Sequence, residues 1–231
     1  MAVSAQHFPA RLLVVADRDY VDDDERWLAL IAEVAAAAID RPVAIQVRAK
    51  SVRTAERDVL AARARDAVPL DVPLLLNGAE ALAERLGYSG VHWPEDDIPT
   101  VRPAHPLAFR SAAVHSIEAA RRAEAAGADL VVFGAVYAPG SKPGAGVGLE
   151  ALRAVIAATS LPVFAIGGIH PEQVADCLRA GAAGIAVVSG ILGAPDVRAA
   201  IDRYLHAIDE VSKTTQSITE SITERIGRTH A

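Results

Sequence analysis

Cysteine is almost absent from this sequence, and the single residue, Cys177, excludes an intramolecular disulfide. A lone cysteine is typical of a reducing compartment. The first fifteen residues lack the basic region followed by an apolar stretch that marks a secretory signal. No apolar run approaches the roughly 20 residues that a membrane span needs. We therefore expect a cytoplasmic protein with no membrane association.

Positive charge is also scarce, because 23 Lys and Arg residues face 29 Asp and Glu residues, giving a formal net charge of −6. A nucleic-acid-binding protein normally carries a basic surplus to meet the phosphates. Aromatic residues make up only 4%, which leaves little for base stacking. We expect no nucleic-acid partner. This composition is compatible with a small phosphate-bearing substrate, because a few cations and backbone N–H groups suffice to bind one phosphate.

Apolar residues are plentiful at 52%, and they gather in eight short runs. The runs are near-continuously apolar, as expected for parallel strands that are covered on both faces. We expect strands at residues 11–17, 42–48, 72–78, 89–93, 108–114, 129–136, 162–168 and 184–190. Alanine-rich segments of helical spacing separate them, at residues 26–39, 55–67, 79–86, 117–126, 149–158, 171–180 and 197–208.

This alternation predicts an α/β fold, a single (β/α)8 TIM barrel. The fourth helix is the weak unit, because the segment after Trp93 is rich in proline and allows at most a short helical turn. We expect the barrel to span residues 1–211. Residues 212–231 form a polar tail, with isoleucine at every fourth position from 218 to 226. That tail is disordered or a short helix, and a role in a homo-oligomer stays open.

The active site of such a barrel lies at the carboxyl ends of its strands. Gln46, Arg48 and Lys50 close the second run at a spacing of two, which directs all three to one side. This places an amide and two cations at the mouth, although a solvated strand end fits the same spacing. Asn77 closes the third run.

Two histidines and one loop also follow strands. His115 comes after the fifth run and is the better acid/base candidate, because histidine titrates near neutral pH. His92 lies between Val91 and Trp93, a setting that favours packing. Ser141 and Lys142 lie in a Gly/Pro-rich loop after the sixth run, which is either a lid over a ligand or a long connection.

The seventh and eighth runs end in glycine-containing turns, with Gly167 and Gly168 in one and Val188 and Ser189 in the other. Barrel enzymes frequently bind phosphate between these two loops, at a helix N-terminus. We therefore expect a phosphate site there.

No group of cysteines and histidines has the spacing of a metal site. The acidic run at residues 95–97 suits Mg²⁺, but solvated charge is the more common role of such a run. Cys177 falls on the expected seventh helix, away from the mouth, and fits a core position.

Taken together, the motifs resemble the superfamily of thiamin phosphate synthases and TenI-type thiazole tautomerases. The resemblance runs from about residue 12 to residue 208. It rests on Gln46-Val47-Arg48-Ala49-Lys50, Asn77, Gly90-Val91-His92, Val114-His115-Ser116, Ala125-Ala126-Gly127-Ala128-Asp129, Phe133-Gly134, Ser141-Lys142, Gly148-Leu149-Glu150, Ala165-Ile166-Gly167-Gly168-Ile169 and Ala186-Val187-Val188-Ser189.

The resemblance implies a role in thiamin biosynthesis and assigns residues to it. In a synthase, which joins a pyrimidine pyrophosphate to a thiazole phosphate, the pyrophosphate contacts are Gln46, Arg48, Lys50, Asn77 and Lys142. The thiazole phosphate contacts are Gly167, Gly168, Val188 and Ser189. A synthase also uses Mg²⁺, held by one aspartate after the third strand and another after the fourth.

The chain departs from the synthase pattern at the two metal-binding aspartates. Gly78 occupies the position of the first aspartate, and only Asp96 or Asp97 could serve as the second. Ala113 also replaces a serine that is usual in the family. The tautomerase branch needs no metal, shares the Asn77-Gly78 pair, and uses a histidine that matches His115. A thiazole tautomerase with His115 as general acid/base and no cofactor is therefore our first interpretation. A Mg²⁺-dependent synthase is the second, and a non-catalytic phosphate-binding barrel is the third.

Overall fold

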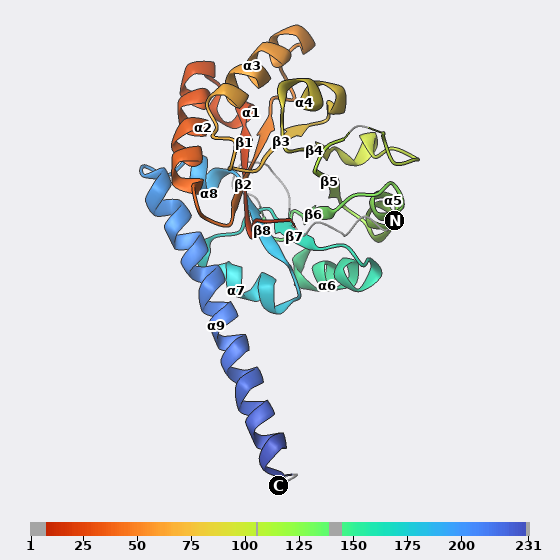
Figure 1. The fold of residues 1–231 in the computed structure, drawn as a ribbon, viewed down its shortest axis with the longest axis vertical. Coiled ribbons are helices and arrows are strands. Elements are labelled where there is room, and N and C mark those ends of the chain that lie inside the picture. Colours follow the sequence, from red (N-terminus) through yellow and green to blue (C-terminus); the bar gives the residue numbers. More distant parts are fainter. Residues whose placement is uncertain (1–7, 105, 139–144, 230–231) are drawn as a thin grey trace.

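The computed structural model describes residues 8–104, 106–138 and 145–229, with side chains as far as residue 214. Eight parallel strands form a closed barrel in chain order, and β1 pairs with β8 (Figure 1). The strands are β1 (Leu12–Asp17), β2 (Val43–Arg48), β3 (Leu74–Asn77), β4 (Gly90–Trp93), β5 (Phe109–Val114), β6 (Leu130–Gly134), β7 (Val163–Ile166) and β8 (Gly184–Val187). The expected TIM barrel is confirmed.

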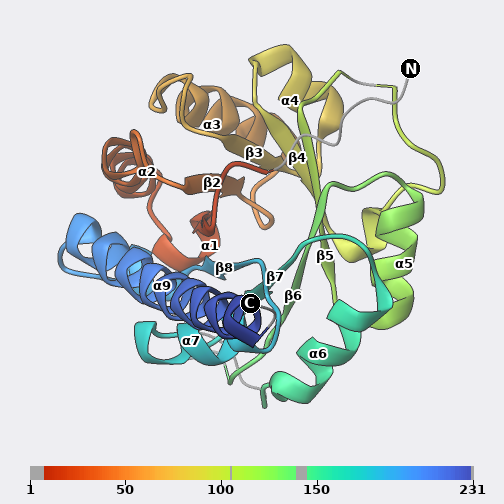
Figure 2. The same ribbon diagram turned by 60° about the horizontal axis from the view of Figure 1, so that its bottom comes forward.

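Helices surround the strands on the outside (Figure 2). They are α1 (Arg18–Val21), α2 (Asp24–Ala38), α3 (Thr54–Asp66), α4 (Glu80–Leu86), α5 (Ile117–Ala125), α6 (Gly148–Ala158), α7 (Pro171–Arg179), α8 (Ser189–Leu192) and α9 (Val197–Thr229). After β4 the chain forms only a three-residue 3₁₀ turn, η1 (Glu95–Asp97), as the proline-rich sequence predicts. Pro171 begins α7 as expected, and Gly87 ends α4 at a φ of 73°.

Side chains alternate along each strand between two apolar clusters. Outward residues such as Leu12 and Val14 pack under the helices, while inward residues such as Leu13 and Val15 fill the barrel. Phe8 covers the amino end of the barrel and meets the rings of Phe109 and Phe164 edge-on, at centroid distances of 5.2 and 5.8 Å. That end is therefore packed shut, and polar residues gather at the carboxyl end.

The last helix, α9, is longer than the sequence pattern predicts. We expected a helix to residue 208, whereas α9 continues to Thr229 and projects beyond the barrel (Figure 1). No proline occurs between residues 197 and 231, and the first glycine is Gly227, so no helix breaker ends it earlier. Its first turns pack against α2, α7 and α8. None of the helices in the part of the chain that the structure describes is both long and apolar enough to cross a membrane.

Candidate active site at the carboxyl end of the barrel

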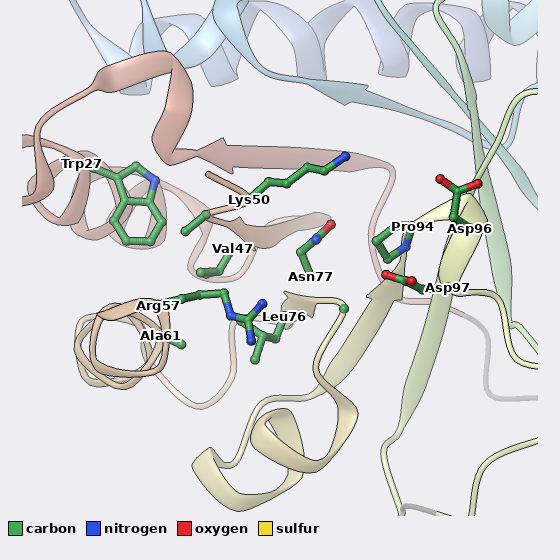
Figure 3. Close-up of a pocket in the computed structure, with 12 residues that line it drawn as sticks. Trp27, Val47, Lys50, Arg57, Ala61, Leu76, Asn77, Pro94, Asp96 and Asp97 are labelled. Atoms are coloured by element: carbon green, nitrogen blue, oxygen red, sulfur yellow. The ribbon is translucent and has the colours of Figure 1, made fainter. Parts of the chain in front are cut away.

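A cavity of about 260 Å³ opens at the carboxyl ends of β2, β3 and β4. It is lined by Trp27, Val47, Ala49, Lys50, Arg57, Ala61, Leu76, Asn77, Gly78, Pro94, Asp96 and Asp97. Figure 3 shows Lys50 and Arg57 on the side of β2 and α3, with Asp96 and Asp97 on the opposite side and Asn77 between them. The cavity therefore has a cationic wall and an acidic wall.

Gln46 and Asn77, which the sequence predicted as site residues, lie together at its inner edge. The Nε2 of Gln46 donates to the Oδ1 of Asn77 at 3.2 Å, and Gln46 is buried. Because the Asn77 carbonyl is engaged in this way, its amide N–H groups are available to donate into the cavity. The two amides thus form one fixed hydrogen-bonding unit.

Arg48, another predicted site residue, is paired with a carboxylate from the neighbouring strand. Its Nη1 donates to the Oδ2 of Asp17 at 2.5 Å, and the Oδ2 of Asp19 lies 3.9 Å away. Asp17 and Arg48 close β1 and β2 at the same register position. The sequence analysis missed Asp17, although an acidic residue that closes β1 beside a cation on β2 was a readable signal.

His115 lies at the end of β5, with its side chain 67% exposed. The Oε2 of Glu95 accepts two hydrogen bonds from it, one from the backbone N–H at 2.6 Å and one from Nδ1 at 2.7 Å. An ionised carboxylate only accepts hydrogen bonds, so Nδ1 carries a proton in this contact. The acidic run at residues 95–97 suggests solvated charge, but Glu95 is the hydrogen-bonding partner of His115.

His92 is buried within the barrel, and its Nδ1 lies 2.8 Å from the Oγ of Ser111. Burial and then the nearby charge of Arg48 lower the pKa of His92 to about 3. The ring is therefore neutral at ordinary pH. This agrees with the packing role that its apolar sequence neighbours favour.

The turns after β7 and β8 have the backbone that their glycines predict. Gly167 and Gly168 adopt φ angles of 99° and 62°, in the left-handed region. A Cβ on Gly168 would meet the carbonyl oxygen of Ala138 at 2.4 Å, so this glycine also lets the β6–α6 loop approach closely. Val188 precedes α8 and Ser189 begins it. The N–H groups of Ile191 and Leu192 donate to the carbonyl oxygen of Val188, so in this turn the N–H groups of Ser189 and Gly190 precede the first intrahelical bond.

Two predicted residues, Ser141 and Lys142, lie outside the described residues. Arg57 and Trp27 line the cavity without having been predicted, because both belong to helices rather than to strand ends. Cys177 is buried in α7, as expected.

Within the described ranges no group of three or more His, Cys, Asp and Glu side chains could hold a metal ion. The cavity nevertheless contains the two carboxylates Asp96 and Asp97, opposite Asn77. Magnesium commonly keeps its waters and binds one or two carboxylates together with phosphate oxygens of the substrate. The donors present therefore fit a Mg²⁺ ion that arrives with a polyphosphate, rather than one held by the protein alone.

The known proteins that are similar to this chain carry closely related names. A family described as thiamine monophosphate synthase matches residues 12–191. A thiamine-phosphate synthase of Natronomonas pharaonis is 39% identical over 193 residues, which cover 78% of this chain and 89% of that protein. A thiamine-phosphate synthase of Roseiflexus sp. is 42% identical over 142 residues, but the match spans only 59% of this chain and 60% of that protein.

A solved structure of similar fold is that of a thiamine phosphate pyrophosphorylase from Pyrococcus furiosus. It aligns with a TM-score of 0.72 at 29% sequence identity, covering 89% of this chain and 98% of that one. The similarity therefore extends over most of the barrel.

Proposed function

The chain belongs to the thiamine monophosphate synthase family, and on that basis we propose that it is a thiamine-phosphate synthase. Such an enzyme joins a pyrimidine pyrophosphate to a thiazole phosphate and releases pyrophosphate. The relatives' names support this transferase rather than the tautomerase that the sequence first suggested to us. The family's role in thiamine biosynthesis is common to both interpretations.

The observation that carries the proposal is the two-walled cavity beside the hydrogen-bonded amides of Gln46 and Asn77. A pyrophosphate leaving group gains negative charge as its bond to carbon breaks, and preorganised cations and N–H donors stabilise that charge. Lys50 and the Asn77 amide supply such groups, and Arg48 lies on the adjacent strand end. The pyrimidine pyrophosphate would thus lie with its phosphates against the ends of β2 and β3.

Mg²⁺ would be held at the acidic wall by Asp96 or Asp97, with pyrophosphate oxygens and water completing its ligands. When bound, the ion neutralises charge on the pyrophosphate. Gly78 contributes no carboxylate, so the protein supplies fewer anionic ligands than the synthase pattern requires. We therefore propose a Mg²⁺ requirement that is met at higher ion concentration than two well-placed aspartates would need.

The thiazole phosphate would bind across the barrel mouth, at the turns after β7 and β8. Gly167 and Gly168 let the backbone approach an anion closely, and the N–H groups that open α8 at Ser189 face the same end of the barrel. Ser141 and Lys142 remain predicted contacts, as in the sequence resemblance. The two phosphorylated substrates would then meet over the centre of the mouth.

Thiazole tautomerisation is the second candidate, and the His115–Glu95 pair is the observation that favours it. In the neutral ring, a proton held on Nδ1 by the carboxylate leaves Nε2 as the nitrogen that accepts a proton, as a general base must. General acid/base help of this kind contributes roughly 10²–10⁴-fold.

The test is a coupled assay of the purified chain with the pyrimidine pyrophosphate and the aromatic thiazole phosphate, with and without Mg²⁺. We expect thiamine phosphate to form only with Mg²⁺. If no product forms although thiazole phosphate binds, the synthase proposal is wrong. The non-aromatic thiazole carboxylate phosphate would then distinguish a tautomerase from a binding protein.

A further inference from the structure

Arg57 is the one cavity residue whose charge no sequence motif anticipated. It comes from the first half of α3, not from a strand end, and its side chain points toward Leu76 and Asn77 (Figure 3). About two thirds of the side chain is buried. The guanidinium thus enters the cavity from α3, while the Lys50 side chain extends into it from the end of β2 (Figure 3).

The guanidinium is poorly satisfied by the protein. Its Nε is buried and has no hydrogen-bond partner among the described residues. The carboxylate of Asp58 lies 3.8 Å from Nη2, which is beyond hydrogen-bonding distance. Arg48 differs, because Asp17 binds it at 2.5 Å.

Part of the cavity wall that Arg57 shares is apolar. Trp27, Val47 and Leu76 line the same cavity, and all three are buried. An arginine that places an unpaired N–H among such residues loses hydration without gaining a protein hydrogen bond. A polyanion in the cavity would supply the missing acceptor. Guanidinium groups match phosphate oxygens well, because their N–H donors form a planar fork.

We propose that Arg57 is a pyrophosphate-binding residue of this chain, an inference that rests on the proposed synthase function. Arg57 and Lys50 are the two cations that line the cavity. Among the described residues, no carboxylate lies within hydrogen-bonding distance of either one. Gly78 leaves the opposite wall with fewer metal ligands. Direct cationic contacts from Arg57 and Lys50 therefore neutralise a larger share of the pyrophosphate charge.

The experiment measures binding of inorganic pyrophosphate to the full chain by calorimetry, with and without Mg²⁺. Trp27 lines the cavity and is one of only two tryptophans, so intrinsic fluorescence gives a second readout. Arg57→Leu should weaken pyrophosphate binding roughly 10-fold or more, the usual effect of losing a hydrogen bond to a charged group. Arg57→Lys should recover part of the loss, because it restores the charge without the fork.

The matched control is Arg53→Gln, which removes a charge from the start of the same helix, where the side chain is 92% exposed. Its pyrophosphate affinity should stay within about twofold of wild type, since exposed charges contribute little. Thiazole phosphate should bind wild type and Arg57→Leu equally, because that phosphate binds across the mouth.

The outcomes separate the two proposals. If the wild type and Arg57→Leu bind pyrophosphate equally well, Arg57 is not a pyrophosphate-binding residue, while the synthase proposal stands. If wild type binds no pyrophosphate, both are wrong. A thermal melt of each variant checks folding, and Arg57→Gln replaces Arg57→Leu if the leucine variant melts early. A purely structural arginine would change the melting temperature and leave the pyrophosphate affinity unchanged.

Discussion

Arg48 and Asp17 close two adjacent barrel strands at one register position, and the Nη1 of Arg48 donates to the Oδ2 of Asp17 at 2.5 Å. The contact holds the guanidinium in place at the mouth of the barrel. It also puts a negative charge beside the proposed pyrophosphate site. Asp17 therefore orients a cation and at the same time repels the anion that this cation would bind.

Asp17→Asn separates these two effects. The amide still accepts a hydrogen bond from Arg48 but carries no charge, so inorganic pyrophosphate should bind about two- to fivefold more tightly, an estimate for one partly screened charge. Turnover should fall, because Arg48 is held less firmly. Titration calorimetry and steady-state kinetics measure the two quantities. The Oδ2 of Asp19 lies 3.9 Å from Arg48, farther than that of Asp17. Asp19→Asn should therefore change the pyrophosphate affinity and the turnover less than Asp17→Asn does.

His92 makes stability sensitive to acid. In the unfolded chain this histidine takes up a proton as the pH falls through about 6.5. In the folded protein burial lowers its pKa to about 3, so the unfolded state binds more protons throughout the interval. The free energy of unfolding should therefore decrease as the pH falls from about 6.5 toward 3, by up to about 1.4 kcal/mol per pH unit from this group.

Urea denaturation of wild type and His92→Gln at several pH values measures that slope. Glutamine can keep a hydrogen bond to Ser111 but does not titrate, so the variant should lose stability less steeply below pH 6.5. The two proteins should show the same slope above pH 7. Parallel slopes over the whole range would contradict a neutral, buried His92.

Gly78→Asp tests whether the acidic wall lacks a ligand. Gly78 has a φ of 87°, and a Cβ there would meet no atom within 4 Å, so an added side chain has room. Aspartate tolerates the left-handed region better than most residues, although at some loss of stability. The added carboxylate should lower the Mg²⁺ concentration for half-maximal synthase activity about tenfold.

Gly78→Asn is the matched control, because it imposes the same backbone strain without the charge. It should leave the Mg²⁺ requirement near that of wild type. If aspartate and asparagine act alike, position 78 does not contribute to metal binding in this chain.

The barrel itself was predictable because strand and helix periodicities are local, and so were the strand-end residues, since parallel strands align their carboxyl ends. The partners of those residues were not. Asp17 lies 31 residues from Arg48, and Glu95 lies 20 residues from His115. Each pairing depends on strand register or on the path of a short turn. Arg57 was missed because its place in the cavity depends on how α3 rotates against β2 and β3.

The contact between Glu95 and His115 yields the last prediction, which separates a structural role from a catalytic one. Glu95 belongs to η1, the turn that also carries Asp96 and Asp97. Its Oε2 accepts from both the backbone N–H and the ring of His115, so it fixes that turn to the end of β5. Glu95→Ala removes both bonds, whereas His115→Ala removes only the one from the ring.

In a synthase, Glu95→Ala should raise the Mg²⁺ concentration for half-maximal activity about fivefold or more, because both proposed metal carboxylates lose their anchor. That figure corresponds to about 1 kcal/mol, the net contribution of one ordinary intramolecular hydrogen bond. His115→Ala should leave synthase turnover within about threefold of wild type, since the backbone N–H still holds Glu95. Mg²⁺ titrations of both variants make the comparison. A loss of 10²-fold or more with His115→Ala alone would instead assign the ring to proton transfer, because general acid/base groups contribute on that scale.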